Sequence, residues 1–290
     1  MSTTDTAAAA GPKPFTLPRK PHYVTLAADC DFFALFQKIE RHFDTCYMLE
    51  SLGEDSHMAR HSIIGFDPEY TLYANGTTLT IENRDGDANH YPSDNPYELL
   101  RSLIPQNIIS RKYAGGLSGY LGYDAMQYFE PSLTLKASDD FDTFRFGLYK
   151  DGLILDKMTG EVTYFYYDNS RYEFLQTLID ADDESAGALH ITALGDTMSK
   201  AEHAEAVAKV KQDIIDGKVF QCEVGFKKRF RIQGDTLALY DQLRTINPSP
   251  QMYYVKFGEQ KLIGASPELL FRLRQGEMET FPLAGTTLRG

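Results

Sequence analysis

The chain has 290 residues, of which 42% are hydrophobic and 24% are charged. This length allows one large domain or two smaller ones, and the composition is that of an ordinary globular protein. Acidic residues outnumber basic ones by 41 to 29, which gives a formal charge of -12. This balance argues against nucleic acid as a partner, because binding phosphates needs a basic surface.

The cysteines and the hydropathy pattern bear on the environment of the protein. Cys30, Cys46 and Cys222 are odd in number and far apart, which predicts reduced thiols in a cytoplasmic protein. No window approaches the roughly 18 to 20 apolar residues of a membrane span, so no membrane association is expected. The first 20 residues have neither a secretory nor a transit pattern and are predicted to be a disordered tail.

The N-terminal half predicts two helices among short strands. Residues 31–43 place apolar side chains on one helical face, with Asp31 as the N-cap. The second helix begins at Asn95, followed by proline at its first position. Residues 70–82 form a predicted hairpin whose Asn75-Gly76 turn supplies positive φ angles.

Glycines mark the remaining turns of this half. Residues 141–167 are predicted to form a strand meander that turns at Asp151-Gly152 and at Thr159-Gly160. The stretch "GGLSGYLGYD", residues 115–124, lacks the pattern of a nucleotide-binding loop. Its four glycines predict close strand packing near the centre of a sheet.

The C-terminal half begins with an acidic stretch, predicted to be a surface connector. A helix follows, with a capping box at Ser199 and Glu202. A strand is expected over 218–232, and then a helix that ends before Pro248. Four strand-like runs follow, with turns near Gly258-Glu259 and Gln275-Gly276. The predicted regions are a tail (1–20), an α+β region (21–180), a connector (181–198) and the first part of a second domain (199–290).

Five motifs in order resemble component I of anthranilate synthase, in the chorismate-utilising enzyme family. They are "LES" (49–51), "GGLSGYLGYD" (115–124), "FQ" (220–221), "NPSPQMYY" (247–254) and "GASPELL" with "PLAGTTLRG" (264–290). The resemblance covers about residues 45 to 290. It implies an α+β fold of two large antiparallel sheets packed face to face with helices outside, here incomplete at the C-terminus. The implied reaction converts chorismate and ammonia to anthranilate and pyruvate with Mg²⁺, and the ammonia comes from a glutamine amidotransferase subunit.

Two positions separate the branches of this family. Gln221 stands where isochorismate and salicylate synthases carry a lysine that activates water, and an amide cannot accept a proton. Ala284 stands where many aminodeoxychorismate synthases carry a nucleophilic lysine. Both residues favour free ammonia as the nucleophile and hence anthranilate synthase. Aminodeoxychorismate synthase component I stays open as an alternative, because some of its members also lack the lysine.

The resemblance also implies a substrate loop and a regulatory site. Gly285 and Thr286 match the residues that contact chorismate, although Thr287-Leu288 replaces the Arg-Pro usual in the family. Tryptophan, as feedback inhibitor, is expected to bind between "LES" and "NPSP". The residues implied for this regulatory site are Glu50, Ser51, Pro250, Gln251 and Met252.

Three of the regulatory residues have an implied task. Glu50 would pair with the ammonium of the ligand, Ser51 would hydrogen-bond to it, and Met252 would contact the indole. Gln251 departs from the aromatic residue usual in the family. For the adjoining Asn247 and Pro248, a merely structural role at the end of a helix is the favoured interpretation.

The catalytic and metal-binding residues of the family are expected beyond residue 290. The segment "KAEHAEA", residues 200–206, only resembles a metal-binding motif and is predicted to be a solvated helix face. We therefore expect this chain to lack the Mg²⁺ ligands and to be inactive alone. A stand-alone amino-acid-binding regulatory fragment is the other function class that the sequence leaves open.

Overall fold

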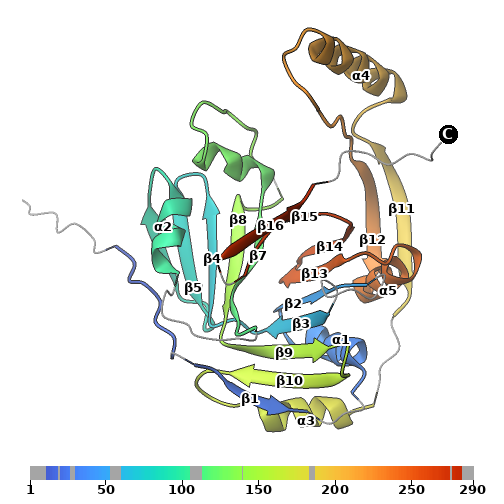
Figure 1. Cartoon of the computed structure of the whole chain (residues 1–290). Helices are drawn as coiled ribbons and strands as arrows, with labels where there is room; N and C mark the ends of the chain where they lie inside the picture. Colours follow the sequence, from blue (N-terminus) through green and yellow to red (C-terminus); the bar gives the residue numbers. More distant parts are fainter. Residues whose placement is uncertain are drawn as a thin grey trace, which may run out of the picture. The chain divides into compact units, whose positions relative to one another are not determined.

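The computed structural model describes residues 11–18, 20–26, 30–52, 60–104, 113–138, 140–182, 187–274 and 276–282 (Figure 1). The chain forms two compact units: Met1–Glu184 together with Leu243–Gly290, and Ser185–Gln242. These bounds differ from the predicted ones, since the last 48 residues join the N-terminal region. The reason is strand pairing between distant segments, described next.

A seven-stranded sheet forms the larger part of the first unit (Figure 1). All of its neighbouring strands pair antiparallel. Their order is β1 (His22–Thr25), β10 (Glu161–Tyr166), β9 (Asp151–Asp156), β3 (His61–Phe66), β2 (Thr45–Glu50), β13 (Gln251–Phe257) and β14 (Gln260–Ser266). The pairing of β13 with β2 brings the C-terminal part of the chain into this sheet.

A five-stranded antiparallel sheet forms the rest of the core of this unit. Its order is β6 (Ala88–Pro92), β5 (Thr78–Asn83), β4 (Tyr70–Asn75), β8 (Phe144–Tyr149) and β7 (Gly116–Leu121). The predicted hairpin consists of β4 and β5, and Gly76 in its turn has a φ of 61°. Among the described residues other than glycine, only Asp67 has a positive φ. The positive φ predicted for Asn75 is therefore wrong.

The predicted meander is wrong at its first turn. The chain leaves the five-stranded sheet after Tyr149 and enters the seven-stranded sheet at Asp151. Gly152 lies inside β9, where a Cβ atom would be 2.5 Å from the Ile64 carbonyl oxygen. This glycine therefore serves strand packing rather than a turn. The second predicted turn is confirmed, with Gly160 at a φ of 72°.

The helices of the first unit lie on the outside of the sheets (Figure 1). They are α1 (Phe32–His42), α2 (Pro96–Leu103), α3 (Tyr172–Asp180) and a 3-10 helix, η1 (Tyr123–Tyr128). Asp31 caps α1 by accepting hydrogen bonds from two backbone amides, and Asn95 caps α2. Both predicted caps are confirmed. α1 packs on β2, and α2 packs on β4 and β5.

The two sheets share a cluster of large side chains. Tyr47 of β2 and Tyr149 of β8 are fully buried, with ring centroids 4.8 Å apart. Val255 and Phe257 of β13 complete the buried cluster, and Tyr120 of β7 packs against it. Because this cluster joins strands of both sheets, the predicted α+β fold with two antiparallel sheets packed together is confirmed.

The glycine-rich motif at 115–124 packs closely, but at a sheet edge. A Cβ atom on Gly119 would fall 2.8 Å from the Cα of Phe146 in β8. Close strand packing, as predicted, therefore requires glycine here. The predicted central position is wrong, since β7 is the last strand of its sheet.

The second unit holds a two-stranded sheet of β11 (Leu189–Asp196) and β12 (Lys228–Gly234), with the helix α4 (Lys200–Ile215) between them in sequence. The predicted connector at 181–198 thus contains a strand. The strand predicted from residue 218 begins only at Lys228, where its pairing with β11 begins. The helix α5 (Thr236–Ile246) crosses the boundary between the units.

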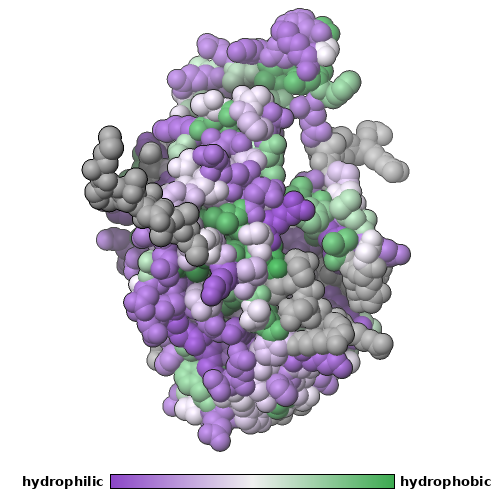
Figure 2. All heavy atoms as spheres, turned by 90° about the vertical axis from the view of Figure 1, so that its left-hand side faces the viewer, coloured by the Kyte–Doolittle hydropathy of each residue, from purple (hydrophilic) through white to green (hydrophobic). Residues whose placement is uncertain are grey.

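Large hydrophobic side chains are exposed on several elements. Phe230 of β12 and Phe271 of β15 are examples; β15 (Leu269–Arg274) pairs with β16 (Glu277–Phe281) as a hairpin in the first unit. Figure 2 shows apolar residues scattered among hydrophilic ones on the face that it displays. In the part of the chain that the structure describes, no helix is both long and apolar enough to cross a membrane.

Candidate functional site

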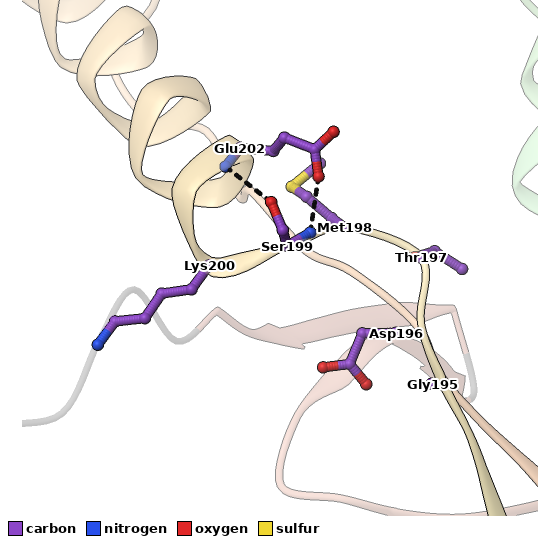
Figure 3. Close-up of a pocket in the computed structure, with 7 residues that line it drawn as sticks. All are labelled: Gly195, Asp196, Thr197, Met198, Ser199, Lys200 and Glu202. Carbon is purple, nitrogen blue, oxygen red and sulfur yellow. Dashed lines mark hydrogen bonds between the residues drawn. The ribbon is translucent and has the colours of Figure 1, made fainter.

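A hollow in the second unit lies at the start of α4 (Figure 3). It is lined by Gly195, Asp196, Thr197, Met198, Ser199, Lys200 and Glu202. The Ser199 hydroxyl accepts a hydrogen bond from the Glu202 amide (3.3 Å), and the Glu202 carboxylate accepts one from the Ser199 amide (2.7 Å). The hydrogen bond that the carboxylate accepts from the Ser199 amide holds the pKa of Glu202 below its usual value. The predicted capping box is thereby confirmed, and the helix start already binds its own side chains.

The two predicted regulatory segments lie side by side in the first unit. Met252 of β13 stands directly opposite Glu50 of β2 in the strand register. Just beyond the end of β2, the Leu52 amide donates to the Ser249 carbonyl over 2.8 Å. "LES" and "NPSP", about 200 residues apart in the chain, are therefore adjacent, as one shared ligand would require.

Glu50 is buried and already holds a cation. Arg244 Nε lies 2.7 Å from Glu50 Oε1, and Nη2 lies 3.2 Å from Oε2. The Glu50 side chain is 3% exposed and that of Arg244 is 24% exposed. The guanidinium also lies over the ring of Phe33, 4.1 Å from its centroid. Both carboxylate oxygens of Glu50 therefore accept hydrogen bonds from Arg244.

Sequence reasoning missed Arg244. It lies in the last turn of α5, three residues before the "NPSP" motif. A cation in the last turn of a helix is common because it offsets the helix dipole, so its position alone did not mark it. Only the fold brings it to Glu50.

Ser51 is held through its backbone. Its carbonyl accepts a hydrogen bond from Lys157 Nζ, which comes from the turn between β9 and β10. Lys157 is the second residue that sequence reasoning missed. The preceding residue, Asp156, is the last residue of β9 and forms an ion pair with Arg60.

The "NPSP" motif ends α5 and starts β13. The Asn247 amide donates to the Leu243 carbonyl, and the Ser249 hydroxyl donates to the Asn247 carbonyl. This supports the structural interpretation of Asn247. Met252 is 1% exposed, whereas Pro250 and Gln251 are half-buried. Residues directly opposite in antiparallel strands share a face, so Met252 lies on the Glu50 side of the sheet.

The remaining predicted residues are Gln221, Ala284, Gly285 and Thr286. Gln221 is exposed in a segment outside the strands of the second unit, next to the fully exposed Phe220. The strand predicted over 218–232 does not include Gln221, since β12 begins at Lys228. Ala284, Gly285 and Thr286 lie outside the described residues.

The described residues do not offer a metal site. Across the described ranges, no group of three or more His, Cys, Asp or Glu side chains is placed to hold a metal ion. In α4, His203 Nε2 lies 3.0 Å from the Val224 carbonyl oxygen and its ring contacts Phe226. This histidine is thus engaged within its own unit.

Comparison with known proteins defines the family. Residues 44–290 match the family described as chorismate binding enzyme. The chain therefore belongs to the chorismate binding enzyme family.

Particular relatives carry a more specific name. The chain is 42% identical over 279 residues to "Anthranilate synthase component 1" of Leptospira biflexa, which covers 94% of this chain and 59% of that protein. It is 36% identical over 260 residues to the protein of the same name from Methanothermobacter marburgensis, which covers 89% of this chain and 55% of the relative. The chain thus spans little more than half the length of these relatives.

A solved structure shares the fold. The crystal structure of anthranilate synthase component I from Streptococcus pneumoniae TIGR4 matches with a TM-score of 0.56 and 21% sequence identity. The match covers 79% of this chain and 55% of that chain. At this identity the comparison concerns the fold alone.

Proposed function

We propose that this chain is part of an anthranilate synthase component I. The observation that carries the proposal is the 42% identity to a protein of that name over nearly the whole chain. The proposed reaction converts chorismate and ammonia to anthranilate and pyruvate with Mg²⁺, in the biosynthesis of tryptophan. A glutamine amidotransferase subunit is the proposed source of ammonia.

Gln221 supports ammonia rather than water as the nucleophile. Its amide has no basic pair at neutral pH, so it cannot activate water by taking a proton. Gly285 and Thr286 are the proposed chorismate contacts, since glycine allows close backbone approach and threonine offers an amide and a hydroxyl.

The paired "LES" and "NPSP" segments support regulation by an amino acid. We propose that tryptophan binds at Glu50, Ser51 and Met252 and inhibits the enzyme. Replacing Ser51 by a bulky residue should remove inhibition and spare catalysis. Unchanged inhibition in that variant would show that the inhibitor binds elsewhere.

We propose that activity needs the part of the relatives that this chain does not span. A bound metal and a positioned acid or base supply large rate factors, and this chain covers only 59% of the Leptospira biflexa protein. The purified chain with Mg²⁺, chorismate and an ammonium salt should give no anthranilate fluorescence above a protein-free control. Sustained fluorescence would contradict this placement of the catalytic groups.

A chimera tests the proposed function directly. Residues 1–290 fused to the part of the Leptospira biflexa relative that the match does not cover should produce anthranilate from chorismate and ammonia. Thr286→Val in that chimera should raise KM or lower kcat. A folded chimera that releases a different product from chorismate, such as aminodeoxychorismate, would overturn the assignment of the reaction.

A further inference from the structure

We propose that Arg171 forms a clamp that makes the two antiparallel sheets of the first unit open as one body. The clamp consists of Arg171, Asp67 and Asp151, and it binds two neighbouring chain segments that pass from one sheet to the other. The inference concerns a conformational property of the fold, and it is independent of the proposed function.

The two connections between the sheets run side by side. Residues 67–69 connect β3 to β4, and Lys150 connects β8 to β9. On one side of this crossing β3 pairs with β9, and on the other side β4 pairs with β8. The apolar cluster around Tyr47 and Tyr149 holds the sheets together, but hydrophobic contact has no preferred direction. Directional bonds at the crossing are therefore needed to fix one sheet relative to the other.

The Arg171 side chain supplies such bonds to both connections. Its Nη1 lies 2.7 Å from Asp67 Oδ2, and its Nε lies 2.7 Å from Asp151 Oδ2. Its Nη2 donates to Asp151 Oδ1 and to the carbonyl of Phe66, the last residue of β3. The exposed fractions of the three charged side chains are 22% for Arg171, 25% for Asp67 and 10% for Asp151. A guanidinium is a planar fork with several donors, so one side chain bridges two carboxylates.

Arg171 is itself fixed by its surroundings. It stands at the N-cap position of α3, and its amide donates to the Tyr164 hydroxyl over 2.9 Å. That hydroxyl donates in turn to Asp151 Oδ2 over 2.9 Å. The guanidinium lies 4.3 Å from the ring centroid of Phe66 and 5.5 Å from that of Phe43. Both the backbone and the side chain of Arg171 are therefore held in place.

Asp67 has a backbone conformation that the clamp helps to impose. Its φ is 48°, the only positive φ among the described residues other than glycine. The left-handed region is unfavourable for residues with a Cβ atom, although Asp and Asn tolerate it better than most. Arg84, which follows β5, also pairs with the Asp67 carboxylate (3.0 Å) and donates to the Asp67 carbonyl (2.7 Å). A strained residue persists where its surroundings over-determine it, and here two arginines do so.

A second cation at the crossing contributes less. Lys150 pairs with Glu69 of the first connection and, over 3.0 Å, with Asp168. Both carboxylates are more exposed than Asp151, at 33% and 48%. Exposed ion pairs add little, and an ammonium lacks the fork that bridges two carboxylates in fixed directions. We therefore assign the coupling of the sheets to Arg171.

Hydrogen exchange measured by mass spectrometry tests the clamp. In the unmodified chain, the slowest amides of β2, β3 and β9 should exchange through the same opening as those of β4, β5 and β8, with the same dependence on urea. In Arg171→Gln the two groups should separate, so that the ratio of their exchange rates changes by about tenfold or more. Asp67→Asn should separate them too, because asparagine tolerates the left-handed region but removes the charge.

Arg145→Gln is the matched control. The Arg145 side chain is 23% exposed and pairs over 2.8 Å with Asp142, three residues earlier in the chain, so the burial of its ion pair is similar but its partner is not at the crossing. This variant should change the exchange rates of both sheets by the same factor.

Two results would overturn the proposal. One is a pair of sheets that already exchange through different openings in the unmodified chain. The other is a common opening that persists in folded Arg171→Gln or Asp67→Asn, whatever the loss of overall stability. Circular dichroism spectra establish which variants are folded. If Arg171→Gln does not fold, Asp67→Asn decides the question, because it leaves Arg171 bound to Asp151.

Discussion

Replacing Gly119 by alanine tests the close approach of β7 to β8. A Cβ atom at this position would lie 2.8 Å from Phe146 Cα and 2.9 Å from the Arg145 carbonyl carbon, and nearer still to the Arg145 carbonyl oxygen. Real Cβ atoms essentially never lie within 3.0 Å of a heavy atom outside their own and the adjacent residues. Since these are backbone atoms, no side-chain rotation relieves the contact. β7 would have to move away from its only partner strand in the described sheet.

The sign of the effect distinguishes packing from propensity. In a strand interior, alanine is favoured over glycine by about 0.5–1 kcal/mol, because glycine loses more conformational entropy on folding. Overpacking costs about 1–3 kcal/mol. We therefore expect Gly119→Ala to lower the free energy of unfolding by about 1–2 kcal/mol. Propensity alone would raise it.

Urea unfolding, followed by far-UV circular dichroism and by the fluorescence of the 18 tyrosines, measures this change. Gly225→Ala is the control, because a Cβ atom there has no neighbour within 4 Å among the described residues and φ is not in the left-handed region. The control should not lose stability. An unfolding midpoint for Gly119→Ala at or above that of the unmodified chain, with an unchanged m-value, would refute the packing argument.

Two further predictions concern titratable groups. Burial raises the pKa of the Cys46 thiol far above its usual value. A thiol reagent should therefore label Cys30 and Cys222 in the folded chain, and Cys46 only after denaturation. Equal labelling rates for all three cysteines would contradict this prediction. Hydrogen bonds from Arg60 hold the pKa of Asp156 below its ordinary 3.8. The contribution of the Asp156 carboxylate to stability is therefore present above pH 3.8, and it is lost as the pH falls through the lower pKa of this group in the folded chain. Asp156→Asn should therefore cost stability at neutral pH but not in strong acid, as measured by urea midpoints across this range, and a pH-independent difference would exclude the ion pair as its cause.

Local signals in the sequence predicted helix starts well. Asp31, Asn95 and Ser199 each cap a helix as predicted. A cap acts over three residues, so its effect is contained in the local sequence. The same holds for the turn at Gly160, where a positive φ requires glycine.

Strand partners could not be predicted in this way. An alternating pattern identifies a half-buried strand but not the strand beside it. Asp151-Gly152 has the composition of a turn, yet it lies where the chain passes from one sheet to the other. The stretch at 181–198 has many small and acidic residues, and its strand β11 is defined by pairing with β12 rather than by burial, since it is largely exposed.

The candidate site was predicted only in part for the same reason. The adjacency of "LES" and "NPSP" followed from the family resemblance, not from any local pattern. Arg244 and Glu50 are 194 residues apart, and neither has a neighbour in sequence that points to the other. The roles of Ser51, Met252 and the other predicted ligand contacts stay predictions.

The order of strands links this site to the rest of the molecule. β13 pairs with β2 from Phe257 to Met252, so the same register that extends the seven-stranded sheet also sets Met252 opposite Glu50. The cation on Glu50 comes from the last turn of α5, and α5 is one continuous helix that begins in the second unit at Thr236. The segment of residues 247–250 connects the end of α5 to the start of β13. The ion pair of Glu50 and Arg244 therefore depends both on where α5 ends and on the register of β13 with β2.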